Sequence, residues 1–157
     1  MLLASAICSC SEKQPEATEP MITKTEIQVE NGQFTPEIMH RLGKVGDVQV
    51  SPDHSKILYG VTYTNIEQNK GNRELYLMNV DGSENVKITN TPKSESNARW
   101  LSDSQIIYMR SGKLYTATIE GATLKNETEV AGAEGMESFE LSPAGDKLMF
   151  IKSVKAA

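Results

Sequence analysis

From Gly46 onward, short apolar segments alternate with polar turns. The segments KILYGVTY, ELYLMNV, QIIYMR, KLYTATI and KLMFIK are rich in Ile, Val, Leu and Tyr, and the turns SPDHS, VDGSE, RSGK and SPAGD separate them. This pattern is typical of antiparallel strands joined by tight turns. No helical pattern of 10–15 residues separates the strands, which argues against helical repeats and a parallel βαβ sheet. We expect strands at 45–50, 56–64, 74–80, 86–89, 98–101, 105–110, 113–119, 138–141 and 147–152.

One short helix is expected before the strands. Thr35 is a good N-cap, Pro36 suits the first helical position, and Glu37 stands in the first turn. Gly43 would end the helix. The pattern therefore predicts a helix, or one turn of it, between Thr35 and Leu42.

The strand region repeats itself. LYLMNVDG, at 75–82, returns as LYTATIEG, at 114–121, a shift of 39 residues. SPDHSKILY, at 51–59, returns as LSDSQIIY, at 101–108, and again as SPAGDKLMF, at 142–150. The first unit differs by a connector about ten residues longer, between Tyr59 and Leu75. A period of about 40–50 residues indicates a solenoid, a propeller or an array.

Successive antiparallel strands in four-stranded units are the blades of a β-propeller. The predicted fold is therefore all-β. It is a partial β-propeller of two four-stranded antiparallel blades and part of a third, with a short N-terminal helix. Alternation predicts these core residues, within one position: Val50, Ile57, Tyr59, Leu75, Leu77, Trp100, Ile107 and Leu114.

The units resemble the TolB-type propeller repeat. The matching elements are Ser51-Pro52-Asp53, Ile57-Leu58-Tyr59, Leu75-Tyr76, Asp81-Gly82, Ile88-Thr89 and Trp100. The stretch TPEIMHRLGKVGDVQVSPD, a short helix leading at once into the first blade, is similar to the start of secreted bacterial serine peptidases of the prolyl oligopeptidase family, in its dipeptidyl-peptidase and acylaminoacyl-peptidase branch. The resemblance implies a propeller that filters peptide substrates and a C-terminal α/β-hydrolase domain that holds the catalytic Ser, Asp and His.

No catalytic residue of that family falls on this chain. The nucleophile of an α/β-hydrolase sits in a G-x-S-x-G elbow. The nearest approach, Asp81-Gly82-Ser83-Glu84-Asn85, lacks the second glycine and occupies a repeat turn. Asp81, Ser83 and Asn85 also alternate like the start of a calcium loop, but the glycine and glutamate that complete such a loop are missing. We expect no catalytic, cofactor-binding or metal-binding residue here, and no hydrolysis by this chain alone.

Charge and composition exclude further classes. The net charge is −5 and no run of Lys or Arg stands out, which disfavours nucleic-acid binding. The two cysteines, Cys8 and Cys10, both lie in the first ten residues. The remaining 147 residues therefore have no thiol, which excludes cysteine-based metal sites and disulfides there. His40 and His54 are the only histidines, so a histidine-rich metal site is disfavoured.

The N-terminus has the features of a targeting segment. Residues 1–10 combine a short apolar run with Cys8 and Cys10, as in a bacterial lipoprotein signal, although no positive residue precedes the run. Cys10 suits lipidation best because the small Ser9 precedes it. The alternative is an ordinary frayed terminus with free thiols. We expect a signal segment at 1–10, a polar linker at 11–33, and the N-terminal part of a propeller at 34–157. We therefore expect a lipid-anchored protein in the periplasm or at the outer membrane of a Gram-negative bacterium.

Two function classes remain open. The chain is either the non-catalytic, substrate-gating N-terminal fragment of a serine exopeptidase that releases dipeptides or acylated residues, or part of a non-enzymatic TolB-like lipoprotein that binds other envelope proteins. The long connector of the first unit is the one region predicted to face substrate, with an ordinary solvated hairpin tip as the alternative. Its polar residues are Glu67, Asn69, Lys70, Asn72 and Arg73.

Overall fold

The computed structural model describes residues 21–154, and its architecture is all-β apart from one short helix. The helix α1 (Pro36–Arg41) begins at the predicted N-cap, where Thr35 Oγ1 accepts a hydrogen bond from the Ile38 amide. His40 and Arg41 stand in its last turn. Among the described residues, none lies in a helix long and apolar enough to cross a membrane.

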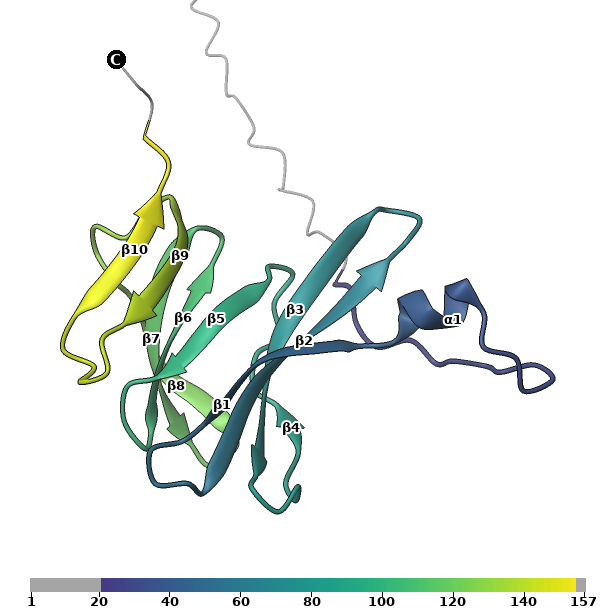
Figure 1. The fold of residues 1–157 in the computed structure, drawn as a ribbon, viewed down its shortest axis with the longest axis horizontal. Coiled ribbons are helices and arrows are strands. Elements are labelled where there is room, and N and C mark those ends of the chain that lie inside the picture. The colour runs from purple at the N-terminus through teal and green to yellow at the C-terminus, as the bar shows by residue number, and fades with distance from the viewer. Residues whose placement is uncertain (1–20, 155–157) are drawn as a thin grey trace, which may run out of the picture.

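Two four-stranded antiparallel sheets and one two-stranded sheet follow in chain order. The first sheet contains β1 (Lys44–Val50), β2 (Lys56–Asn65), β3 (Lys70–Asn79) and β4 (Val86–Lys87). The second contains β5 (Glu95–Trp100), β6 (Gln105–Arg110), β7 (Lys113–Glu120) and β8 (Thr123–Glu129). The third pairs β9 (Met136–Leu141) with β10 (Leu148–Lys152). Figure 1 shows the sheets side by side like a sector of a propeller, with α1 projecting at the end opposite β10. The predicted fold class is confirmed.

The repeats seen in the sequence share one register. Val50 pairs with Ile57 in the first sheet, Trp100 with Ile106 in the second, and Leu141 with Leu148 in the third. Strands β1 and β5 also contain a bulge at the same repeat position, where Asp47 and Asn97 have positive φ. The first strand of each sheet, β1, β5 and β9, is called the inner strand below, because β5 contacts both of the others.

Two apolar clusters join neighbouring sheets. Between the first and second sheets lie Leu58, Leu75, Leu77, Ile88, Ala98, Ile106, Tyr108 and Ala117. Between the second and third lie Ile107, Met109, Leu114, Ala133, Met136 and Phe139. Burial of these side chains supplies the main driving force that holds the sheets face to face.

The core prediction holds at most positions and is wrong at one. Tyr59, Leu75, Leu77, Ile107 and Leu114 are buried. Trp100 is half-buried against the first cluster, and Ile57 is half-buried while its neighbour Leu58 is fully buried. Val50 is 53% exposed, because no sheet formed by residues 21–154 covers that face of β1.

Three strand predictions need correction. Strand β8 was not expected, because TLKNETE has no apolar alternation and only its pairing with β7 makes it a strand. Strand β3 begins at Lys70 instead of Glu74, so the long connector is a continuation of the β2–β3 hairpin. Strand β5 begins at Glu95, three residues before the expected start.

Candidate functional site

The residues predicted in the long connector lie in two different environments. Glu67 and Asn69 stand in the exposed β2–β3 turn, where the Asn69 amide donates to the Ile66 carbonyl. Lys70, also exposed, is the first residue of β3. Asn72 and Arg73 lie inside β3 instead of at a loop tip, which corrects their expected placement. Asn72 is 2% exposed and Arg73 is half-buried.

Asn72 belongs to a buried polar cluster between the first and second sheets. We define the polar cluster as Asn72, Glu74, Thr89, Thr91, Glu95 and Arg110. The Asn72 amide donates to Glu74 Oε1 (3.1 Å) and to the Thr91 carbonyl (2.8 Å). The Thr89 hydroxyl donates to Glu74 Oε2 (2.6 Å) and accepts from the Leu75 amide. The segment that links the two sheets is thus tied to β3 by a carboxylate and an amide.

Glu95 is the most enclosed member of the polar cluster. It is 0% exposed, and its Oε1 accepts a hydrogen bond from the Thr91 hydroxyl at 2.8 Å. Arg110 Nη1 lies 3.7 Å from the same oxygen, whereas Oε2 has no hydrogen-bond partner. Burial raises the pKa of Glu95 to about 7, and the nearby Glu74 carboxylate acts in the same direction. Glu95 is therefore poised to hold a proton near neutral pH.

The polar cluster cannot act as a catalytic centre in this arrangement. A general acid must reach the reacting atom of a substrate, and Glu95 is closed off from solvent. Ser83, on the β3–β4 turn, donates its hydroxyl to Asp81 and accepts a hydrogen bond from the Asn79 side-chain amide, and neither partner is a histidine. Among residues 21–154, no group of three or more His, Cys, Asp or Glu side chains lies close enough to hold a metal ion.

A second polar contact joins the inner strands. The Arg73 guanidinium lies over Gly60, where an added Cβ would stand 2.3 Å from Nε. Its Nη2 donates to Asp47 Oδ2 at 2.9 Å, and the same carboxylate oxygen accepts from the Asn97 amide of β5 at 3.2 Å. Asn97 Nδ2 in turn donates to the Phe139 carbonyl of β9 at 2.7 Å. The bulge residue of each of the first two inner strands thus binds the next inner strand.

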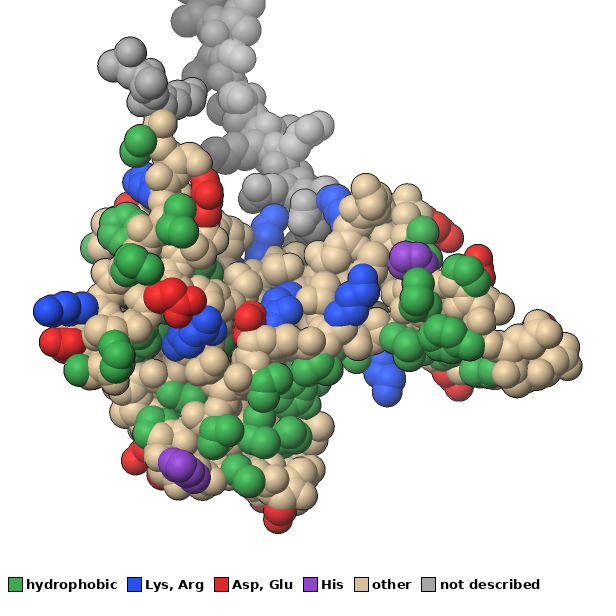
Figure 2. Space-filling model, viewed as in Figure 1, with side chains coloured by type: hydrophobic (Ala, Val, Ile, Leu, Met, Phe, Trp, Pro, Cys, Tyr) green, Lys and Arg blue, Asp and Glu red, His purple; other side chains and the backbone are tan. Residues whose placement is uncertain are grey.

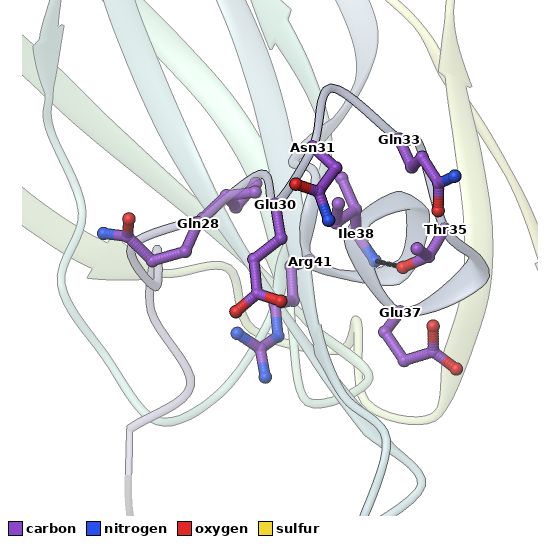
Figure 3. Close-up of a pocket in the computed structure, with 9 residues that line it drawn as sticks. Gln28, Glu30, Asn31, Gln33, Thr35, Glu37, Ile38 and Arg41 are labelled. Atoms are coloured by element: carbon purple, nitrogen blue, oxygen red, sulfur yellow. Dashed lines mark hydrogen bonds between the residues drawn. The ribbon is translucent and has the colours of Figure 1, made fainter.

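One pocket lies away from the sheets. A cavity of about 300 Å³ separates the segment before α1 from the helix itself, and Figure 3 shows the side chains that surround it. Its charged lining comes from Glu30, Glu37 and Arg41. The backbone amide of Glu37 and the Thr35 hydroxyl lower the pKa of the Glu37 carboxyl, so this group is charged at neutral pH. Its lining is mainly polar, and it includes no serine, cysteine or histidine side chain.

Sequence reasoning missed Glu74, Glu95 and Arg110. A charged residue inside an apolar strand pattern, such as Glu74 in ELYLMNV, was the available signal. Cys10 and the rest of the expected signal segment lie outside the described residues. His54 is exposed in the turn that follows β1, with φ +61°.

The sequence of the chain is similar to those of two known peptidases. No protein-family model matches the sequence. The chain is 29% identical over 125 residues to Dipeptidyl-peptidase 5 of Porphyromonas gingivalis, and 24% identical over 136 residues to Dipeptidyl-peptidase 5 of Porphyromonas endodontalis. The matches cover 78% and 83% of this chain but only 18% and 19% of the relatives. The chain is thus related to dipeptidyl-peptidases over less than a fifth of their length.

Proposed function

We propose that the chain is the N-terminal, non-catalytic propeller part of a secreted bacterial serine exopeptidase that releases dipeptides or acylated residues from peptides. The observation that carries the proposal is the pair of matches, which span about four fifths of this chain and less than a fifth of each dipeptidyl-peptidase. The absence of a G-x-S-x-G elbow in the sequence fits a segment that lies before the hydrolase domain.

The geometry suits substrate filtering better than chemistry. The inner strands lie next to one another and are joined by Asp47 and Asn97, which stiffens the side of the sector that would line a propeller axis. Arg99 and Glu140, a partly exposed ion pair at 3.4 Å, lie on two of these strands. In the longer protein, such a wall admits peptides by size and charge to a hydrolase domain beyond it.

Labelling with a fluorophosphonate probe tests the proposal. Such probes react with an activated serine nucleophile, which needs a base and an oxyanion hole. We expect no labelling of residues 11–157 and strong labelling of the complete reading frame, together with cleavage of a dipeptidyl chromogenic substrate. Labelling of the fragment would contradict a downstream active site. A folded complete protein that fails to label would instead support the non-enzymatic, TolB-like lipoprotein that binds envelope proteins.

We also propose that Cys10 anchors the protein to the membrane on the periplasmic side or at the outer membrane. Ser9 before Cys10 and the apolar run at 1–7 support this assignment. Incorporation of labelled palmitate should be lost in Cys10→Ala and retained in Cys8→Ala. Equal incorporation in the two variants would contradict it.

A further inference from the structure

Glu95 stands at a position where the repeat itself requires no charge. It pairs with Arg110 across β5 and β6, whereas the same register position holds Val45 in the first sheet and Met136 in the third. An apolar residue therefore satisfies this position of the fold. A buried carboxylate there lowers stability unless its charge is compensated, so the presence of Glu95 needs a reason other than packing.

The guanidinium of Arg110 lies between two carboxylates. Its Nη1 stands 3.7 Å from Glu95 Oε1, which is beyond hydrogen-bond distance. On its other side, Nη1 donates to Glu127 Oε2 at 3.1 Å and Nη2 donates to Glu127 Oε1. The Tyr108 hydroxyl donates to the same Glu127, and the guanidinium covers the Tyr115 ring, 4.3 Å from its centre. In this geometry Arg110 binds the carboxylate of β8 and leaves Glu95 without a bonded cation.

The arrangement suits a Glu95 side chain that holds its proton. Glu95 is 0% exposed, and no donor within residues 21–154 reaches its Oε2. An ionised oxygen there would be uncompensated, which is costly in an enclosed site. Burial raises the pKa of Glu95 to about 7, and the nearby Glu74 adds to the effect. At Glu127 burial acts in the same direction but is outweighed, because hydrogen bonds from Arg110 and Tyr108 lower the pKa of that carboxyl.

The other charged groups on the strands packed against β5 are held by partners of their own. They form the ion pairs Asp47–Arg73 and Arg99–Glu140, and Glu74 accepts hydrogen bonds from Asn72 and Thr89. None of these groups offers a cation to Glu95, so Arg110 is the countercharge within reach when Glu95 ionises. A shift of the guanidinium by about 1 Å brings Nη1 to the distance of a charge-assisted hydrogen bond.

We propose that Arg110 is a shared cation through which the proton on Glu95 controls the attachment of β8. While Glu95 is protonated, the guanidinium binds Glu127 and fixes β8, an edge strand whose pairing with β7 is interrupted by a bulge. When Glu95 loses its proton to bulk water, the guanidinium moves toward the buried carboxylate and Glu127 loses its bonds to Arg110. The half of β8 around Glu127 then opens more often. This exchange of partners is a property of the fold and does not depend on peptidase activity.

Hydrogen exchange of the complete protein tests the inference. Peptides that cover β8 are compared with peptides that cover β6 at pH 6 and pH 8, with exchange times scaled for the pH dependence of the intrinsic rate. We expect the protection of β8 to fall about tenfold at pH 8 and that of β6 to stay unchanged, because loss of charge-assisted hydrogen bonds opens the edge strand alone. Equal loss of protection in β6 and β8 overturns the inference, since ionised Glu95 then destabilises the whole sheet.

Three Glu→Gln variants assign the effect. Glu95→Gln cannot ionise, so β8 should be equally protected at the two pH values. Glu127→Gln removes the carboxylate that competes for Arg110, so the protection of β8 should be low at both. Glu129→Gln is the control on the same strand, because Glu129 is paired with Lys113, and it should respond to pH like the wild type. A pH response that persists in Glu95→Gln or in Glu127→Gln overturns the inference. The wild-type comparison decides it even where one variant fails to fold.

Discussion

At the residue scale, the enclosure of Glu95 makes the stability of the chain depend on pH. An unfolded Glu loses its proton near pH 4.3, whereas Glu95 in the folded chain keeps it to about pH 7. Below about pH 4 both states are protonated. Between these values the folded state binds more protons than the unfolded state, so the free energy of unfolding falls as pH rises. The loss of stability is complete above about pH 7.

Urea unfolding from pH 5 to pH 8 checks this expectation. We expect the urea concentration at the midpoint of wild-type unfolding to fall across that range, because the folded state loses its preference for the protonated carboxyl. Glu95→Gln removes the charge at nearly constant shape, so the fall should disappear and the variant should be more stable than wild type at pH 8. Glu129→Gln is the control, because Glu129 is exposed and paired with Lys113. A fall that persists in Glu95→Gln would assign the pH dependence to another group.

A second prediction at this scale concerns the packing of Arg73 on Gly60. An added Cβ at Gly60 would meet the guanidinium group at 2.3–2.6 Å, so Gly60→Ala should displace Arg73 from Asp47 and cost about 1–2 kcal/mol. The cost should fall sharply in an Arg73→Ala background, because the clash is then gone. Gly71→Ala is the matched control, since its Cβ would stand 3.4 Å from the nearest atom. Additive costs in the double-mutant cycle would refute the coupling.

At the scale of elements, the bulge in β5 holds the third sheet. Asn97 has φ +53° and its side chain donates to the Phe139 carbonyl of β9. Asn97→Gly keeps the backbone relaxed, because glycine tolerates positive φ, and removes only the side-chain bond. We expect faster amide hydrogen exchange in β9 and β10 and unchanged exchange in β2 and β3.

The matched control for that experiment is Asn126→Gly in β8. Asn126 also has positive φ, +52°, but it is exposed at the edge of the second sheet. Its substitution should leave β9 and β10 unaffected. If Asn97→Gly also leaves them unaffected, the apolar cluster around Phe139 alone fixes the third sheet.

At the scale of the whole molecule, residues 21–154 present two incompletely covered sheet faces. One is the outer face of the first sheet, where Val45, Val48, Val50 and Val80 are more than half exposed and Figure 2 shows hydrophobic side chains gathered. The other lies on the third sheet, where Met149 and Ile151 are 65% and 57% exposed. Such surfaces and an unpaired edge strand favour association. Sedimentation of residues 34–157 should therefore show an average mass that rises with concentration. Thermal unfolding of the same residues, followed by circular dichroism, should be broad and weakly cooperative.

Two added charges on the outer face of the first sheet should weaken that association. We expect Val48→Lys/Val50→Lys to lower the average mass at a given concentration. Ile66→Lys, at the equally exposed β2–β3 turn, should leave it unchanged. A strictly monomeric wild-type chain that unfolds cooperatively would contradict the expectation that this sector needs neighbouring sheets.

The sequence by itself determined the strands and turns, because these depend on local chemistry. Alternation of apolar residues, the turn residues and the Thr35 cap are properties of short segments, and they located α1 and most strands. The repeat also indicated the stacked sheets, since units of equal length carry the same pattern. The sequence pattern did not predict strand β8, because its residues are polar at nearly every position and only pairing with β7 holds them extended.

Only the tertiary structure decided which residues are buried and what the polar ones contact. Val50 and Trp100 occupy the same repeat position, but a neighbouring sheet covers Trp100 and leaves Val50 exposed within the described chain. Asn72 and Arg73 had the composition of a loop tip, yet the hairpin extends through them and brings Asn72 to Thr91 and Arg73 to Asp47. Burial and pairing depend on segments about 20 to 50 residues away, and no local pattern encodes those distances.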